Sequence, residues 1–190
     1  MTRALYAAGW GYVALCGLLV AMPQARQRRA PHIPAASFRG EGSAWFAGMK
    51  PFCNAVEVEV QQQYRPAPAG VQGSGYSAAC FALAGKIERA RETIERLPAG
   101  DRGEAAGIVF AVGHPVADAG DDESAGPIMR LVVEYQPENY MALYHAGISE
   151  HILGHADLAR THLERFLAIY QPEDGWRANA KAVLAKLDAR

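Results

Sequence analysis

The chain has 190 residues, half of them hydrophobic, which is enough to bury one ordinary core or several small stacked units. Its formal net charge of −1 provides no positive field able to hold nucleic acid, so nucleic acid is not expected as a partner. The three cysteines form no Cys-x-x-Cys or Cys/His pattern, which argues against a structural zinc and against a redox dithiol. Cys53 and Cys80 either pair in an oxidising compartment or remain two unpaired core residues.

The first element is an uncharged run over residues 4–22, long enough to span about 30 Å of hydrocarbon as a helix. We therefore expect an N-terminal transmembrane anchor or signal segment over residues 1–23, and the protein at the membrane. An anchor is favoured because Pro23 stands where signal cleavage needs a small residue. Arginines after the run favour a cytoplasmic domain, whereas an uncleaved signal exports the chain that follows it, so the side of the membrane stays open.

Residues 24–42 carry prolines, glycines and mostly positive charge without an apolar period, which predicts a flexible basic tether. Residues 43–70 are expected to form an N-terminal helical cap. Its apolar stripe consists of Trp45, Phe46, Met49, Cys53, Val56, Val60 and Tyr64. The alternating VEVEV at residues 56–60 is typical of a strand, but helix is favoured because no partner strand is evident. GVQGSG, residues 70–75, is predicted to be a linker turn.

The same spacing of small and apolar residues, which we call the ladder, then recurs three times. Gly85, Gly120 and Gly154 lie 35 and 34 residues apart, each seven residues after another small residue and five before an alanine. The pattern predicts a helix, a glycine turn and a second helix whose small residues allow close approach. Helix packing is assigned to Ala78, Gly85, Ala90, Gly113, Gly120, Ala125, Gly147, Gly154, Ala159, Leu163 and Phe166. A lone hairpin cannot bury its apolar face, so neighbouring hairpins must stack.

Residues 71–172 resemble tetratricopeptide (TPR) repeats, most closely between Tyr140 and Pro172. The resemblance lies in the 34-residue spacing, the small residues at repeat positions 8, 15 and 20, the bulky residue at 24 and the proline near 32. It implies an all-α fold, an α-solenoid of about three helical hairpins with capping helices. In the second repeat, Gly126 and Pro127 interrupt the pattern, so the second helix there is expected to begin only at Pro127.

Residues 173–190 are expected to form the C-terminal capping helix. Asp174 is its predicted N-cap. One face of this helix carries Trp176, Ala180, Val183, Leu184 and Leu187, and would cover the last hairpin.

The resemblance also implies a peptide-binding groove, because the first helix of each TPR hairpin lines the concave face. The corresponding residues are Phe110, His114, Met141, Tyr144, Ile148 and His151. Phe110 and Tyr144 either line this groove or belong to the core between repeats. The expected partner is another protein or a peptide segment, bound as a helix or in extended form, and self-association is also open.

No catalytic residue, metal or cofactor is predicted. His151 and His155 are four apart, but Gly154 ends the helix between them, so their rings need not share a face. The acidic run at 118–123 lacks the spacing of a calcium loop and is typical of a helix start. The sequence therefore favours a non-enzymatic, membrane-tethered scaffold. The alternative is a small envelope metal-binding protein or hydrolase that uses His114, Asp118, His151 and His155.

Overall fold

A computed structural model describes residues 40–189, and this part of the chain is all-α, without a β-strand. The expected membrane segment at residues 1–23 and nearly all of the tether lie outside the described residues. Among residues 40–189, no helix combines the length and the apolar character needed to cross a membrane.

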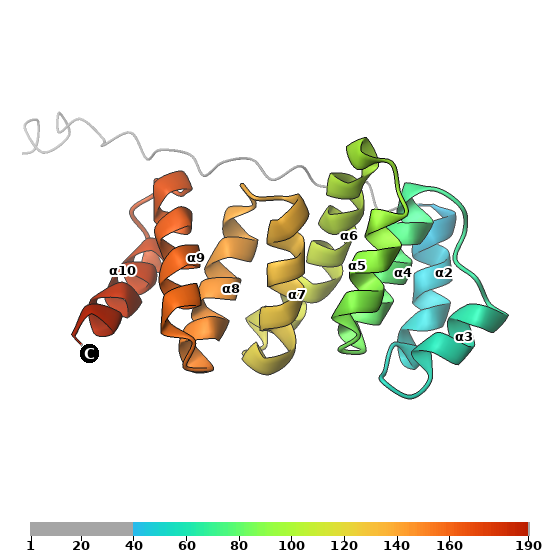
Figure 1. Ribbon diagram of the computed structural model, residues 1–190, viewed down its shortest axis with the longest axis horizontal. Coiled ribbons are helices and arrows are strands. Elements are labelled where there is room, and N and C mark those ends of the chain that lie inside the picture. The colour runs from blue at the N-terminus through green and yellow to red at the C-terminus, as the bar shows by residue number, and fades with distance from the viewer. Residues whose placement is uncertain (1–39, 190) are drawn as a thin grey trace, which may run out of the picture.

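The helices follow one another along the long axis of the molecule (Figure 1). In chain order they are α2 Glu41–Met49, the 3-10 helix η1 Lys50–Phe52, α3 Val58–Tyr64, α4 Val71–Leu83, α5 Ile87–Glu95, α6 Ala99–Asp118, α7 Asp122–Tyr135, α8 Tyr140–Ile152, α9 Ala156–Ile169 and α10 Gly175–Asp188. From α4 to α9 they form three packed pairs, with α2 against α4 at one end and α10 against α8 and α9 at the other.

The two helices of each pair are joined by a turn that contains a glycine of the same conformation. Gly85, Gly120 and Gly154 have φ angles of 71°, 78° and 84°, in the left-handed region that glycine adopts without strain. In each case the residue after the glycine donates its backbone N–H to a carbonyl five residues earlier, as Lys86 does to Phe81 at 2.9 Å. These bonds satisfy the last carbonyls of the first helix, so the chain leaves it sharply and returns as the second helix.

Small residues lie where the two helices of a pair cross. A Cβ added to Gly113 would lie 2.6 Å from Ile128 Cγ2, and one added to Gly147 would lie 2.6 Å from Leu163 Cγ. The alanines, leucine and phenylalanine of the ladder are all fully buried: Ala78, Ala90, Ala125, Ala159, Leu163 and Phe166. The helices therefore approach each other more closely than a larger side chain would allow.

The two junctions between the pairs differ. At the first, α4 packs broadly against α6, while α5 contributes little. At the second, α8 packs mainly against α7 and approaches α6 only over a small region. Side chains, more than backbone contact, must therefore bridge α6 and α8.

Two predicted boundaries in this region are wrong. Helix α4 begins at Val71, so residues 71–75 are helical and only Gly70, with φ of 95°, lies in a turn before the helix. Helix α7 begins at Asp122 and runs through Pro127. Its N-cap is Asp121, whose carboxylate accepts the backbone N–H of Ser124 at 3.2 Å, so the cap sets the start of the helix and the proline costs one internal hydrogen bond.

The N-terminal cap is held to the helix pairs by the Cys53–Cys80 disulfide, which has a Cα–Cα distance of 4.8 Å. The cap starts at Glu41, two residues before the expected residue 43. The predicted stripe fails after Cys53, because Val56, Val60 and Tyr64 are 86%, 50% and 80% exposed. Val58 is buried instead. The VEVEV segment enters α3, as the preference for helix over strand predicted.

Candidate functional site

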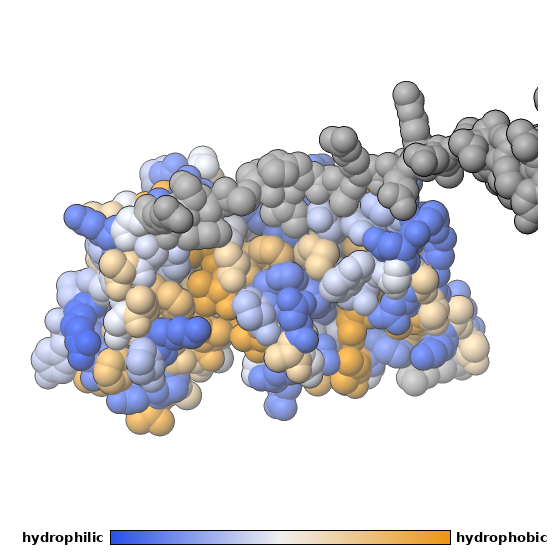
Figure 2. Space-filling model, turned by 180° about the vertical axis from the view of Figure 1, so that it is seen from behind, coloured by the Kyte–Doolittle hydropathy of each residue, from blue (hydrophilic) through white to orange (hydrophobic). Residues whose placement is uncertain are grey.

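The candidate site lies on the side of the molecule formed by α4, α6 and α8. In Figure 1 the second helices of the pairs, α5, α7 and α9, face the viewer. Figure 2 shows the molecule from behind, and hydrophobic side chains gather in the middle of that face, flanked by hydrophilic ones. An apolar area within a polar surround is a common feature of interaction surfaces.

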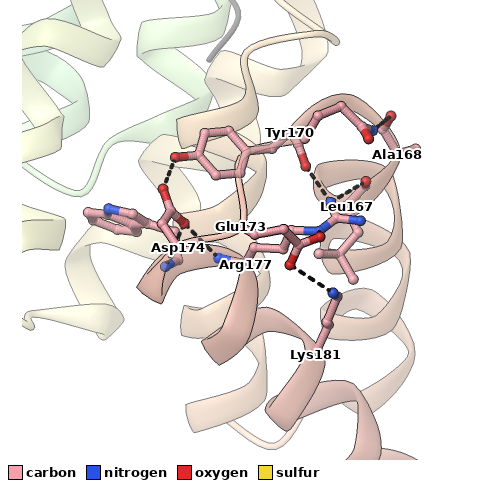
Figure 3. A network of polar contacts seen from close by, with 9 residues as sticks. Leu167, Ala168, Tyr170, Glu173, Asp174, Arg177 and Lys181 are labelled. Carbon is pink, nitrogen blue, oxygen red and sulfur yellow. Dashed lines mark hydrogen bonds and ion pairs between the residues drawn. The ribbon is translucent and has the colours of Figure 1, made fainter. Parts of the chain in front are cut away.

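At one end of this side, α10 is locked to the end of α9 (Figure 3). Arg177 donates from Nη1 to the carbonyl of Leu167 at 3.0 Å and to that of Tyr170. Asp174 caps α10 by accepting the backbone N–H groups of Trp176 and Arg177 at 3.1 and 3.2 Å, and it also accepts a hydrogen bond from the hydroxyl of Tyr170. Burial and this hydrogen bond raise the pKa of Tyr170 to about 12, so the phenol remains a donor. The orientation of α10 is thus fixed by its first turn.

In this orientation α10 contacts Tyr144 of α8, which the sequence analysis assigned either to the groove or to the core. Its hydroxyl accepts from Asn179 Nδ2 at 2.6 Å, and its ring meets Trp176 edge-on at 4.8 Å and Phe166 at 5.2 Å. Only 8% of Tyr144 is exposed. The ring therefore packs between α8, α9 and α10, and little of it is left for a ligand. Of the other expected groove residues, Phe110, His114, Met141, Ile148 and His151 are half-buried.

A cluster of two imidazoles and a carboxylate bridges α6 and α8. His114 and Asp118 lie one turn apart on α6, and His145 lies on α8. The Nε2 atoms of the two histidines are 3.1 Å apart, and Asp118 Oδ1 is 3.6 Å from each of them. Phe110, one turn before His114, stacks on its ring at 4.9 Å. We call His114, Asp118 and His145 the His–Asp–His cluster.

The members of this cluster differ in their access to water. His145 is 7% exposed, whereas the side chains of His114 and Asp118 are 28% and 51% exposed. Burial lowers the pKa of His145 to about 4, helped by His114 and opposed by the charge of Asp118. At neutral pH the His145 ring is therefore uncharged, and one of its nitrogens carries a free electron pair.

The remaining histidines of the last helix pair are not in this cluster. His155 Nδ1 lies 2.5 Å from Glu150 Oε2, and Glu150, which is fully buried, is also paired with Arg130 of α7. His151 has a buried Nδ1 with no hydrogen-bond partner among the described residues. The structure therefore brings together His114 and Asp118 from the alternative hypothesis, and joins them to His145 instead of His151 and His155.

Another hollow of the described surface lies away from this cluster. It is an open pocket of about 370 Å³ between α3, α4 and α5, lined by residues that include Gln62, Ser77, Phe81 and Arg89. Gln62 and Ser77 hydrogen-bond to each other, at 2.5 Å between Ser77 Oγ and Gln62 Oε1. Two of the polar side chains that line this pocket are therefore engaged with each other.

The sequence prediction missed His145 and Asn179, whereas it correctly placed Trp176 on the face of the C-terminal helix that covers the last hairpin, where Trp176 meets Tyr144. No local motif marks His145, because it follows His114 by 31 residues. The available signal was the repeat pitch, which places the first helices of consecutive pairs next to each other. Comparisons of the chain with protein-family models, with curated proteins and with solved structures find no match.

Proposed function

We propose that this chain is a membrane-tethered scaffold, an α-solenoid of TPR-like hairpins that binds another protein or a peptide segment in an assembly at the membrane. The observation that carries the proposal is the recurrence of one turn geometry at Gly85, Gly120 and Gly154, at a pitch of 34–35 residues. Each helix pair packs mainly against its neighbours, so the stack presents a long continuous side to a partner.

The proposed binding surface is the α6–α8 part of that side. Phe110 of α6 and Ile148 of α8 are half-buried and pack against the core, so each keeps a partly exposed apolar surface. Phe110 lies one turn before His114 and Ile148 one turn after His145, so both are close in sequence to the two rings that meet across α6 and α8. Aromatic and apolar side chains in such positions suit an amphipathic helix or an extended apolar segment.

The disulfide supports a location of this domain on the oxidising side of the membrane. Cys53 and Cys80 are joined, and such bonds persist in extracytoplasmic compartments and are rare in reducing ones. Together with residues 4–22 as an uncleaved anchor, this favours an exported domain. Protease added on the side of the membrane away from the cytoplasm should digest the domain, and protection from the protease would instead place the domain in the cytoplasm.

Site-specific photo-crosslinking tests the binding surface. A photoreactive phenylalanine analogue at Ile148 should yield a discrete crosslinked product in the native membrane. The matched control is the same analogue at Leu158, which lies on α9 and is 46% exposed. A Phe110→Ala variant that retains its helical content should lose about 1 kcal/mol or more of binding free energy, roughly a fivefold weaker capture.

Comparing the crosslinked products from Ile148 and Leu158 shows whether the partner binds at the α6–α8 side. A product from Ile148 and none from Leu158 supports binding at the α6–α8 side. Equal products from both positions, or a product only from Leu158, would contradict the proposed surface. A product whose mass equals two copies of this chain would identify self-association as the function of the surface.

A further inference from the structure

The His–Asp–His cluster has the ligand spacing of a metal site. The three atoms form a triangle with sides of 3.1, 3.6 and 3.6 Å, so a point in their plane lies about 2.0 Å from each of them. Zinc binds histidine nitrogen at about 2.0–2.1 Å and carboxylate oxygen at about 2.0–2.2 Å. A zinc ion at or slightly above this plane would therefore reach all three atoms without backbone movement.

Contacts within the cluster do not by themselves explain this arrangement. One histidine can donate to the other across 3.1 Å, but the 3.6 Å distances from Asp118 are too long for hydrogen bonds. A cation between the three atoms would be coordinated by the carboxylate and by both imidazoles. It would also join α6 to α8, which have little backbone contact of their own.

Neighbouring side chains hold the two rings in place. Phe110 stacks on His114, and the rings of Tyr144 and Trp176 meet the His145 ring edge-on, with centroid distances of 5.4 and 5.8 Å. Packing of this kind limits ring rotation, so the ligands are pre-organised. The side chain of Asp118 is half-exposed, so an ion can reach the cluster from solvent.

We propose that His114 Nε2, His145 Nε2 and Asp118 Oδ1 bind one zinc ion, with water at the fourth position. Two imidazoles with one carboxylate favour zinc and related transition metals over Mg²⁺ and Ca²⁺, which prefer all-oxygen sites. The ion fastens the second helix pair to the third. This inference does not depend on the proposed partner binding.

Zinc titration of the purified, tag-free full chain tests the site. After chelation and buffer exchange, calorimetry and elemental analysis should show one zinc per chain, and zinc should raise the melting temperature. Co²⁺ in place of zinc should produce visible d–d absorption, while excess Mg²⁺ or Ca²⁺ should not displace the ion. Asp118→Asn should weaken zinc binding by more than the roughly 10–100-fold typical for loss of an outer-shell partner.

The controls separate this site from the other histidines. His151→Gln removes a ring from the same helix as His145 but outside the cluster, and should bind zinc as the unmodified chain does. Asp118 is half-exposed, so Asp118→Asn should keep its fold, which circular dichroism can verify, whereas His145→Gln alters a buried position. Absence of stoichiometric zinc binding, or unchanged affinity in both Asp118→Asn and His114→Gln, would overturn the proposal.

Discussion

Replacing Gly147 with alanine tests whether close helix crossing determines this fold. Gly147 lies on α8 where it crosses α9, and an added Cβ would lie 2.6 Å from Leu163 Cγ and 3.3 Å from Leu163 backbone nitrogen. Leu163 is fully buried, and close packing of a protein core leaves little space for it to move into. Either Leu163 leaves its rotamer or α9 shifts away from α8.

The expected loss of stability combines two opposing effects. Forcing an extra methyl group into a packed core costs about 1–3 kcal/mol. Alanine in a helix is about 1 kcal/mol more favourable than glycine. Gly147→Ala should therefore lower the free energy of unfolding by about 0–2 kcal/mol.

Gly48→Ala is the matched control, because Gly48 lies in helix α2 with no heavy atom within 4 Å of an added Cβ. This variant gains helix propensity without a clash, so the difference between the two variants measures packing alone. We expect a difference of about 1–3 kcal/mol, or roughly 3–9 °C in melting temperature for a domain of this size. Urea and thermal unfolding followed by circular dichroism give both values. If Gly147→Ala is as stable as Gly48→Ala, the reasoning about small residues at the crossings is refuted.

Three further predictions concern the cap, a buried carboxylate and a buried histidine. Removing the disulfide with Cys53→Ala and Cys80→Ala should cost about 3.5 kcal/mol on the chain-entropy model for a separation of 27 residues; a reductant that leaves the urea midpoint of the unmodified chain unchanged would argue against this. Arg130→Met removes a partner from the fully buried Glu150 and should cost about 1–3 kcal/mol in urea unfolding, since Arg130 itself is partly exposed; no loss would show that Glu150 does not need this partner. Burial lowers the pKa of His162, so protons bind the unfolded chain more strongly, and stability present above about pH 6.5 should decline as pH falls below it. His162→Leu should show a smaller loss of urea midpoint between about pH 7 and pH 5, and an equal loss would exclude His162 as a cause.

The helix pairs were predictable because their determinants are local. Glycine at position 120 or 154 supplies a left-handed residue that ends one helix, and the alanine five residues later lies in the next. The start of α7 was misjudged because Pro127 is a conspicuous breaker, whereas the cap at Asp121 is a weaker pattern that acts earlier. The prediction of an apolar stripe through Val56 was wrong because η1 and the residues after it interrupt the α-helix. A helical period cannot be continued across such an interruption.

The sequence by itself determined the all-α class, the pitch of the ladder and the glycine turns, since each depends on residues within one or two helices. Only the tertiary structure decided that Tyr144 packs against α10 and that His145 meets His114 and Asp118. Those contacts depend on how one helix pair is placed against the next. That placement is set by the sum of many small packing terms spread over residues far apart in the chain, and no short pattern records it.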